Sequence, residues 1–225
     1  MKKIHLVAII LCFFAASCDK SNDPAPTPNP TDNFMNMKAG SIWNYEVTNN
    51  TPPPSTSSYT LTSTNSDTTI GGKQYHVYTN SNNGAREYYH VSGTDYYTYQ
   101  SLPAAFGGSK VENLYLKAGA AVNSSWSQTY DISFNSLPLA VTVVNKIEEK
   151  GISRTVNGIS YNNVIHVSTS LSVAGVPPAS LVTDIDYYYA PNYGMIENTS
   201  KININYFTII NNSDFTTRLK TAVLL

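Results

Sequence analysis

The sequence has few cysteines and few charged residues. Its 225 residues include 2 cysteines, and 14 basic residues nearly balance 15 acidic ones. It also lacks the Gly-x-Ser-x-Gly, Gly-x-x-x-x-Gly-Lys and His-Glu-x-x-His patterns that accompany nucleophilic serines, phosphate-binding loops and zinc sites. No basic run offers a binding surface for a phosphate backbone. We therefore expect a protein that is not an enzyme, needs no cofactor or metal, and does not bind nucleic acid.

Long hydrophobic runs are missing as well. The longest, Leu6–Ala16, spans 11 residues, whereas a helix that crosses a bilayer needs about 20. Lys2 and Lys3 precede this run, and small residues occupy positions 15–17 at its end. A basic start, a short apolar stretch and small residues before a cleavage point are typical of a secretory signal peptide. We assign residues 1–17 to such a signal.

The next residue is Cys18, and Ala15-Ala16-Ser17-Cys18 resembles a lipobox, at which bacterial lipoproteins are acylated and cleaved. Cleavage by an ordinary signal peptidase is the alternative. Cys12 lies within the signal, so Cys18 would be the single cysteine of the mature chain, and a lipid explains why it has no disulfide partner. Residues 18–33 form a tether with prolines at every second position from Pro24 to Pro30. We expect acyl chains such as palmitate to anchor the protein in the cell envelope, at the outer membrane, facing the periplasm or the exterior.

Tyrosine is abundant, with 17 residues, and it favours strands. Alternation of a more apolar and a polar face is clear over Trp126–Phe134, Ile165–Val173, Ile202–Ile210 and Phe215–Val223, as in an antiparallel sheet with one covered face. Turn residues separate such runs. Asn157-Gly158 favours a two-residue hairpin, and Asn211-Asn212 marks another break. We expect residues 34–225 to form one all-β domain, an antiparallel meander of about 12 strands folded as a sandwich or an open barrel.

The chain shows a possible internal duplication. Lys38-Ala39-Gly40 precedes Trp43, and Lys117-Ala118-Gly119 precedes Trp126, which are the two tryptophans of the chain. This repetition predicts two similar halves, residues 36–110 and 111–225. The alternative is that glycine turns and tryptophan anchors recur in unrelated β proteins. In either case we expect both tryptophans to anchor the core.

Three short motifs carry a family resemblance. Met37–Tyr45 contains Gly-x-x-Trp-x-Tyr, residues 72–75 read Gly-Lys-x-Tyr, and Tyr188–Ile196 contains Tyr-x-Ala-x-x-x-Gly. Together they resemble a broad group of uncharacterised all-β lipoproteins of Gram-negative bacteria. Met37 and Ala39 stand where that group usually has Leu and Val. The resemblance implies an envelope location and a β fold, and it implies no activity.

Runs of tyrosine are the strongest candidates for a binding surface. Neighbouring tyrosines on a strand point to opposite faces, so some of them leave the core. We expect Tyr88, Tyr97, Tyr99 and Tyr188 to bind a ligand by stacking on a sugar ring or gripping a protein partner. The alternative is that tyrosine simply suits half-exposed strands.

Titratable residues give weaker candidates. His166 lies on the polar face of its strand, where we expect an exposed side chain, and His76 and His90 flank a predicted turn. Asp184 and Asp186 share one face of a strand, about 7 Å apart. They would suit glycan hydrolysis if another acid, such as Glu87 or Glu197, met them in a cleft.

The leading hypothesis is a lipid-anchored protein with a non-enzymatic binding or structural role. Its partner would be a glycan, a lipid or an envelope protein. Apolar residues inside a barrel would favour a lipid carrier, whereas tyrosines on a concave face would favour a module that binds a different kind of ligand. The alternatives are a carboxylate-based glycan hydrolase and a fimbria-like subunit that exchanges strands, for which Phe215–Leu225 would be the donor.

Overall fold

The computed structural model describes residues 32–82, 84–101, 110–134, 137–206 and 209–225. The predicted signal peptide, Cys18 and nearly all of the predicted tether fall in residues 1–31 and lie outside the described residues. Within the described part of the chain, no helix is long and apolar enough to cross a membrane.

Twelve antiparallel strands form one sheet in the order β6-β5-β4-β3-β2-β1-β12-β11-β10-β9-β8-β7. The strands are β1 (Ile42–Asn49), β2 (Ser55–Ile70), β3 (Lys73–Asn80), β4 (Arg86–Ser92), β5 (Asp95–Ser101), β6 (Lys110–Lys117), β7 (Ser125–Phe134), β8 (Leu137–Val156), β9 (Ile159–Val173), β10 (Leu181–Ala190), β11 (Gly194–Tyr206) and β12 (Ile209–Val223). A 3-10 turn, η2 (Pro178–Ser180), lies between β9 and β10. The predicted all-β class, strand number and antiparallel meander are confirmed.

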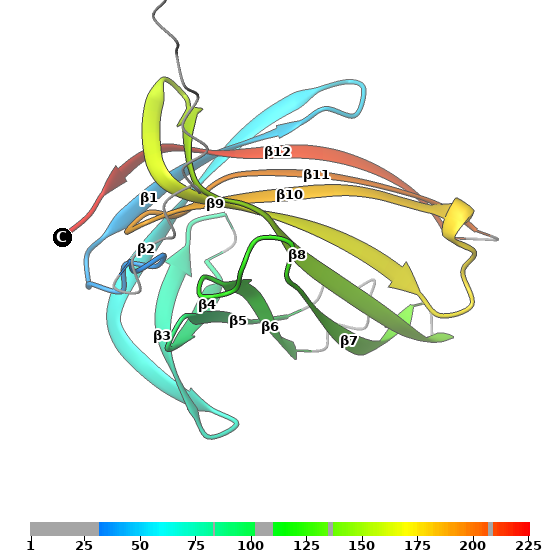
Figure 1. The fold of residues 1–225 in the computed structure, drawn as a ribbon, viewed down its shortest axis with the longest axis horizontal. Helices are drawn as coiled ribbons and strands as arrows, with labels where there is room; N and C mark the ends of the chain where they lie inside the picture. The colour runs from blue at the N-terminus through cyan, green and yellow to red at the C-terminus, as the bar shows by residue number, and fades with distance from the viewer. Residues whose placement is uncertain (1–31, 83, 102–109, 135–136, 207–208) are drawn as a thin grey trace, which may run out of the picture.

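The sheet rolls into a barrel-like wall (Figure 1). With one exception, each strand pairs with the next one along the chain, and β12 returns to pair with β1 from Ile42↔Val223 to Asn49↔Phe215. All strands belong to one continuous sheet. Of the two predicted architectures, the open barrel therefore describes the protein and the sandwich does not.

The exception is the seam between β6 and β7, where the backbone ladder stops. Side chains of β7 bridge it. Gln128 Oε1 accepts a hydrogen bond from the Leu114 amide at 2.7 Å, and Trp126 Nε1 donates to the Leu114 carbonyl at 2.7 Å. Tyr130 Oη donates to the Glu112 carbonyl at 3.2 Å. These bonds satisfy backbone groups that an unpaired edge would leave free.

The hairpin between β8 and β9 follows directly from its sequence. Asn157 and Gly158 both have positive φ, 49° and 80°. Two such residues in succession form the type I′ turn whose twist matches that of the flanking strands. The prediction of a two-residue hairpin is confirmed.

The hairpin between β11 and β12 corrects two predictions. Ile202–Ile210 is not one strand, because β11 ends at Tyr206 and β12 begins at Ile209. Asn211-Asn212 is not a break, because both residues pair with β11 within the ladder. The alternation of apolar and polar residues continues through this reversal, so it hides the turn.

Residues 32–37 fill one end of the barrel, called here the plugged end. Phe34 is fully buried, with 0% of its surface exposed, and its amide donates to Tyr96 Oη at 3.0 Å. Tyr78 Oη donates to the Asn36 carbonyl at 2.7 Å. The amide of Asn192 donates to the Asn33 carbonyl at 2.6 Å. Strands distant in sequence thus hold this segment in the interior.

Glycine and tryptophan complete the plugged end. Gly194 has φ +69°, and a Cβ there would lie 3.2 Å from the Phe34 carbonyl, so glycine permits this close approach. Trp43 is 1% exposed and belongs to the core, as predicted. Trp126 is only partly buried against that core and mainly closes the seam.

The two halves of the chain contribute six strands each to the sheet. Strands β1–β6 and β7–β12 meet at the β1–β12 ladder and at the seam. The predicted division between residues 110 and 111 falls within β6. That the halves arose by duplication stays a prediction.

Candidate functional site

The barrel encloses a cavity of about 830 Å³. It extends from the plugged end to the end that carries η2, called here the η2 end. Pockets that hold small molecules typically measure roughly 300–1,000 Å³. The interior of this barrel is therefore large enough for a ligand of that size.

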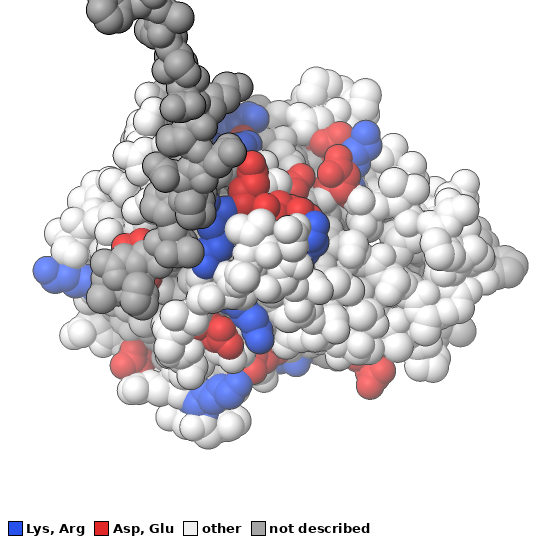
Figure 2. Space-filling model, in the orientation of Figure 1, with Lys and Arg blue, Asp and Glu red and all other residues white. Residues whose placement is uncertain are grey.

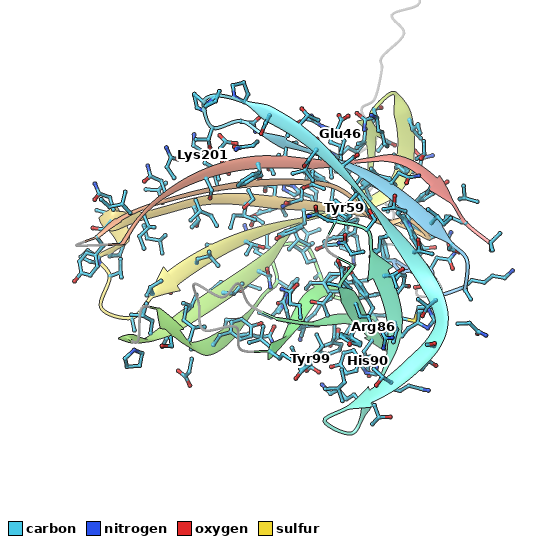
Figure 3. All side chains as sticks on the ribbon, turned by 180° about the vertical axis from the view of Figure 1, so that it is seen from behind. Glu46, Tyr59, Arg86, His90, Tyr99 and Lys201 are labelled. Atoms are coloured by element: carbon cyan, nitrogen blue, oxygen red, sulfur yellow. The ribbon has the colours of Figure 1, made fainter. Side chains whose placement is uncertain are left out.

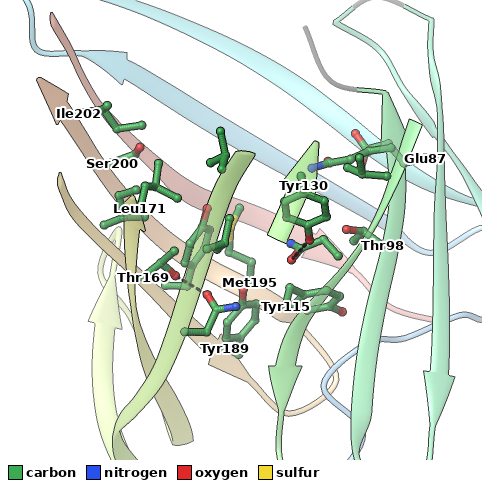
Figure 4. A pocket seen from close by; sticks show the side chains of 18 of the residues that line it. Glu87, Thr98, Tyr115, Tyr130, Thr169, Leu171, Tyr189, Met195, Ser200 and Ile202 are labelled. Atoms are coloured by element: carbon green, nitrogen blue, oxygen red, sulfur yellow. Dashed lines mark hydrogen bonds between the residues drawn. The ribbon is translucent and has the colours of Figure 1, made fainter. Parts of the chain in front are cut away.

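One wall of the cavity is aliphatic. Strand alternation points Leu171 of β9, Ile185 of β10, and Ile202 and Ile204 of β11 inward, and Figure 4 shows Leu171 and Ile202 on this side. Ile210 of β12 continues the wall at the η2 end, where 74% of its surface is exposed. On the face shown in Figure 2, hardly any charged side chains lie at that end of the molecule. An apolar chain that lies along this wall would be stabilised, because its surface is removed from water.

The facing wall is more polar, although Val111 and Ile132 also line it. Glu87 of β4, Thr98 of β5 and Tyr130 of β7 project from it (Figure 4). Glu87 Oε1 accepts a hydrogen bond from Asn80 Nδ2 at 2.6 Å, and Glu87 Oε2 accepts one from Tyr89 Oη at 2.8 Å. An aliphatic wall opposite a polar wall is complementary to an amphiphilic molecule.

Tyrosines line the middle of the cavity. They are Tyr45, Tyr59, Tyr89, Tyr115, Tyr130, Tyr187, Tyr189 and Tyr193. The rings of Tyr45 and Tyr59 stack with centroids 5.1 Å apart, and those of Tyr115 and Tyr189 lie 5.5 Å apart. Burial raises the pKa of Tyr45, Tyr89, Tyr115 and Tyr189 well above the usual value. These phenols are neutral near pH 7, and the hydroxyl groups of Tyr45 and Tyr89 donate to the Met195 carbonyl and to Glu87.

Trp43 adds a buried donor to the cavity lining. Its side chain lines the cavity, and its Nε1 is buried without an acceptor among the described residues. A buried donor left without a partner costs about 1–3 kcal/mol. Because this atom has no accessible surface, a ligand in the cavity does not reach it.

The predicted ligand-binding tyrosines lie on the outer face instead. Tyr88 of β4 and Tyr97 and Tyr99 of β5 alternate with residues that line the cavity, so they point away from it. Tyr88 and Tyr99 have ring centroids 6.4 Å apart, and His90 and Tyr97 have theirs 5.6 Å apart. Figure 3 shows His90 and Tyr99 close together on this face. The structure thus gathers three of the four tyrosines, and their binding role stays a prediction.

Tyr188, the fourth, lies on the outer face of β10. The His166 ring stacks on it at 4.4 Å, and the Arg154 guanidinium lies 3.3 Å from its ring centroid. His166 Nε2 is 2.7 Å from Asp186 Oδ1, and its side chain is 15% exposed. The prediction of an exposed His166 is wrong, because these neighbours cover it.

The predicted meeting of Asp184 or Asp186 with Glu87 does not occur. Asp184 and Asp186 share the outer face of β10, as expected, but Glu87 lines the cavity on the opposite face of the sheet. Glu197 is paired with Arg154 and Arg218. Figure 2 shows acidic and basic side chains gathered on this outer face, as expected for such pairs. Glu87 is the one carboxylate among the described residues that line the cavity.

Three residues form a serine–histidine–aspartate constellation that the sequence did not reveal. Ser63 Oγ is 2.8 Å from His76 Nε2, and His76 Nδ1 is 2.7 Å from Asp67 Oδ1. This is the spacing of a nucleophile, its base and an orienting acid. Ser63, however, is 1% exposed, and its Oγ donates to the Met37 carbonyl at 3.1 Å. A substrate has no access to this oxygen. The three residues instead help to hold residues 32–37 in the plugged end.

The inward tyrosines were not predicted from the sequence. Neighbouring tyrosines face opposite ways, and the binding role was expected for Tyr88 rather than Tyr89. The signal that could have separated them is the position of Val91, an apolar residue two places from Tyr89. Residues two apart share a face, so Tyr89 belongs with the core.

Two solved structures share the fold. A putative lipoprotein from Parabacteroides distasonis matches with a TM-score of 0.50 and 11% identity, over 85% of this chain and 99% of that chain. A putative exported protein with a YmcC-like fold from Bacteroides fragilis matches with a TM-score of 0.51 and 9% identity, over 85% of this chain and 99% of that chain. At these identities the likeness extends to the fold alone. No protein-family model and no curated protein matches the chain.

Proposed function

We propose that this chain is an exported envelope lipoprotein whose barrel binds one apolar or amphiphilic molecule. The cavity of about 830 Å³, with an aliphatic wall facing a polar one, carries the proposal. The role is binding rather than catalysis, because the cavity supplies one carboxylate and the buried Ser63 lies outside it. The names of the two structural neighbours, a lipoprotein and an exported protein, agree with an envelope location.

The anchor and the cavity fit together in this proposal. The described chain starts at Asp32 in the plugged end, so a tether that begins at Cys18 would join the domain there. The η2 end, with its exposed Ile210, would then face away from the attachment point. A ligand would enter the barrel from this end.

The strand-exchange alternative has less support. Most of the proposed donor, Phe215–Leu225, belongs to β12, which is hydrogen-bonded to β1 on one side and β11 on the other. Donating it to another chain would break both ladders. A binding cavity needs no such rearrangement.

A pair of tryptophan substitutions tests the cavity. Ser200 points into it from β11, whereas the next residue, Lys201, is exposed on the outside (Figure 3). We expect Ser200→Trp to fill the space and weaken binding of the neutral fluorophore N-phenylnaphthylamine by about tenfold or more. Lys201→Trp, the matched control on the same strand, leaves binding unchanged. Equal binding by both variants and the wild type would refute a ligand site in the interior.

The anchor has its own test. The intact mass of the mature protein from native membranes is compared for the wild type and Cys18→Ala. The proposal predicts a diacyl or triacyl mass on the wild type, and release from the membrane in the variant. An unmodified, freely soluble wild type would contradict the anchor and leave the cavity proposal standing.

A further inference from the structure

The charge of the cavity limits which amphiphilic molecules it can bind. This inference rests on the proposed function. Among the described residues that line the cavity, Glu87 is the one ionisable residue other than the tyrosines, and Lys, Arg and His are absent. The neighbouring Arg86 belongs to the opposite face of β4 and is exposed there (Figure 3). The interior therefore presents a negative charge with no basic side chain lining the same space.

Glu87 retains capacity for a ligand. Its two oxygens accept one hydrogen bond each, from Asn80 and from Tyr89. A carboxylate offers about four acceptor positions, so roughly two stay free. Asn80 and Tyr89 also fix the orientation of the carboxylate, which lowers the entropy lost when a ligand donor binds.

The geometry points to an amphiphile whose polar end is cationic or a hydrogen-bond donor, held beside Glu87 while its apolar chain lies along Leu171, Ile185 and Ile202. An anionic end would meet the carboxylate without a compensating cation. Rejection of a competitor by like charge is a common source of specificity. The site would thus distinguish long-chain amines and alcohols from fatty acids, which have the same chains.

The test uses three ligands that differ only in the polar end: dodecylamine, dodecanol and dodecanoate. Their affinities for the full mature chain are measured by displacement of N-phenylnaphthylamine at neutral pH and low salt. We expect dodecylamine to bind at least about tenfold more tightly than dodecanoate, since two charges a few ångströms apart interact strongly in a site partly shielded from water. Raising the salt concentration should change this ratio little, because a partly buried pair is poorly screened.

Two variants test whether Glu87 causes the difference in affinity between the amine and the carboxylate. Glu87→Gln removes the charge inside the cavity, and the ratio of amine to carboxylate affinity should fall towards one. Glu46→Gln removes a charge that is paired with Lys220 outside the cavity (Figure 3), and the ratio should stay at the wild-type value. Circular dichroism confirms that both variants remain folded.

The outcomes separate the two proposals. If none of the three ligands binds the wild type, the cavity function itself is wrong. If dodecanol binds but dodecanoate binds as tightly as dodecylamine, only the charge selectivity is wrong. A ratio that falls equally in both variants would show that net charge, rather than Glu87, controls selectivity, and this too would overturn the inference.

Discussion

The two ends of the barrel belong to one sheet but are filled differently. At the plugged end, Phe34, Trp43 and Leu116 are 0%, 1% and 0% exposed. At the η2 end, Ile210 is 74% exposed, and the space behind it belongs to the cavity. Tight packing at one end supplies stability and lets the other end keep an internal space, which close-packed protein interiors rarely contain.

The first prediction compares a core residue of each end. Phe34→Ala should lower the free energy of unfolding by about 3–5 kcal/mol, because it empties a fully packed site. Leu171→Ala should lower it by only about 1 kcal/mol, because that side chain already borders the cavity. Urea denaturation measures both values. Equal losses would show that the two ends are packed alike.

The second prediction concerns the tyrosines between the two ends. Burial raises the pKa of Tyr45, Tyr89, Tyr115 and Tyr189 in the folded protein. Their contribution to stability is fully present below the unfolded pKa near 10 and is lost as the pH rises towards the folded values. Ultraviolet absorbance should therefore show part of the tyrosines ionising only together with unfolding. Ionisation of all tyrosines in a folded protein would contradict this.

The third prediction concerns the seam. Trp126→Phe removes the donor to the Leu114 carbonyl and should cost about 1 kcal/mol. Hydrogen exchange at the Leu114 amide, which bonds to Gln128 across the seam, should accelerate. Amides in the β1–β12 ladder serve as the control and should exchange as before. Unchanged exchange at Leu114 would mean that the seam does not depend on Trp126.

The last prediction has the smallest effect. Burial tends to raise the pKa of Glu112, but hydrogen bonds from Lys73 and Tyr75 and the charge of Lys73 hold it below the usual value. This depressed pKa contributes stability above the unfolded value near 4, and the contribution is lost as the pH falls through the folded pKa. Because both side chains of the Glu112–Lys73 pair are partly exposed, we expect about 0.5 kcal/mol or less. Glu112→Gln should remove this pH dependence in urea denaturation at acidic pH, and a variant with the same dependence as the wild type would exclude it.

Much of the fold follows from the sequence because alternation and turn chemistry are local signals. The predicted strand at Trp126–Phe134 lies within β7, and Asn157-Gly158 forms the predicted hairpin turn. The turn after Tyr206 was missed because the alternation continues through it, with no Gly or Pro between Ile202 and Ile210. Alternation also shows that a sheet has one apolar face without showing whether the sheet curls, so the choice between sandwich and barrel needed the structure.

The site was less predictable than the fold. The abundance of tyrosine correctly pointed to this residue type. The four tyrosines predicted to bind a ligand, however, lie on the outer face, while residues such as Tyr89 and Tyr189 line the cavity. The cavity forms only when strands from the whole chain come together, and its lining residues extend from Met35 to Ile210. No local pattern encodes the space between strands that are distant in sequence.

A crystal structure of the protein with a brominated long-chain alcohol would test the binding cavity most directly. The proposal predicts an anomalous peak inside the barrel, along Leu171, Ile185 and Ile202. A peak on the outer tyrosines Tyr88, Tyr97 and Tyr99 with an empty interior would contradict it, and would favour the binding surface predicted from the sequence.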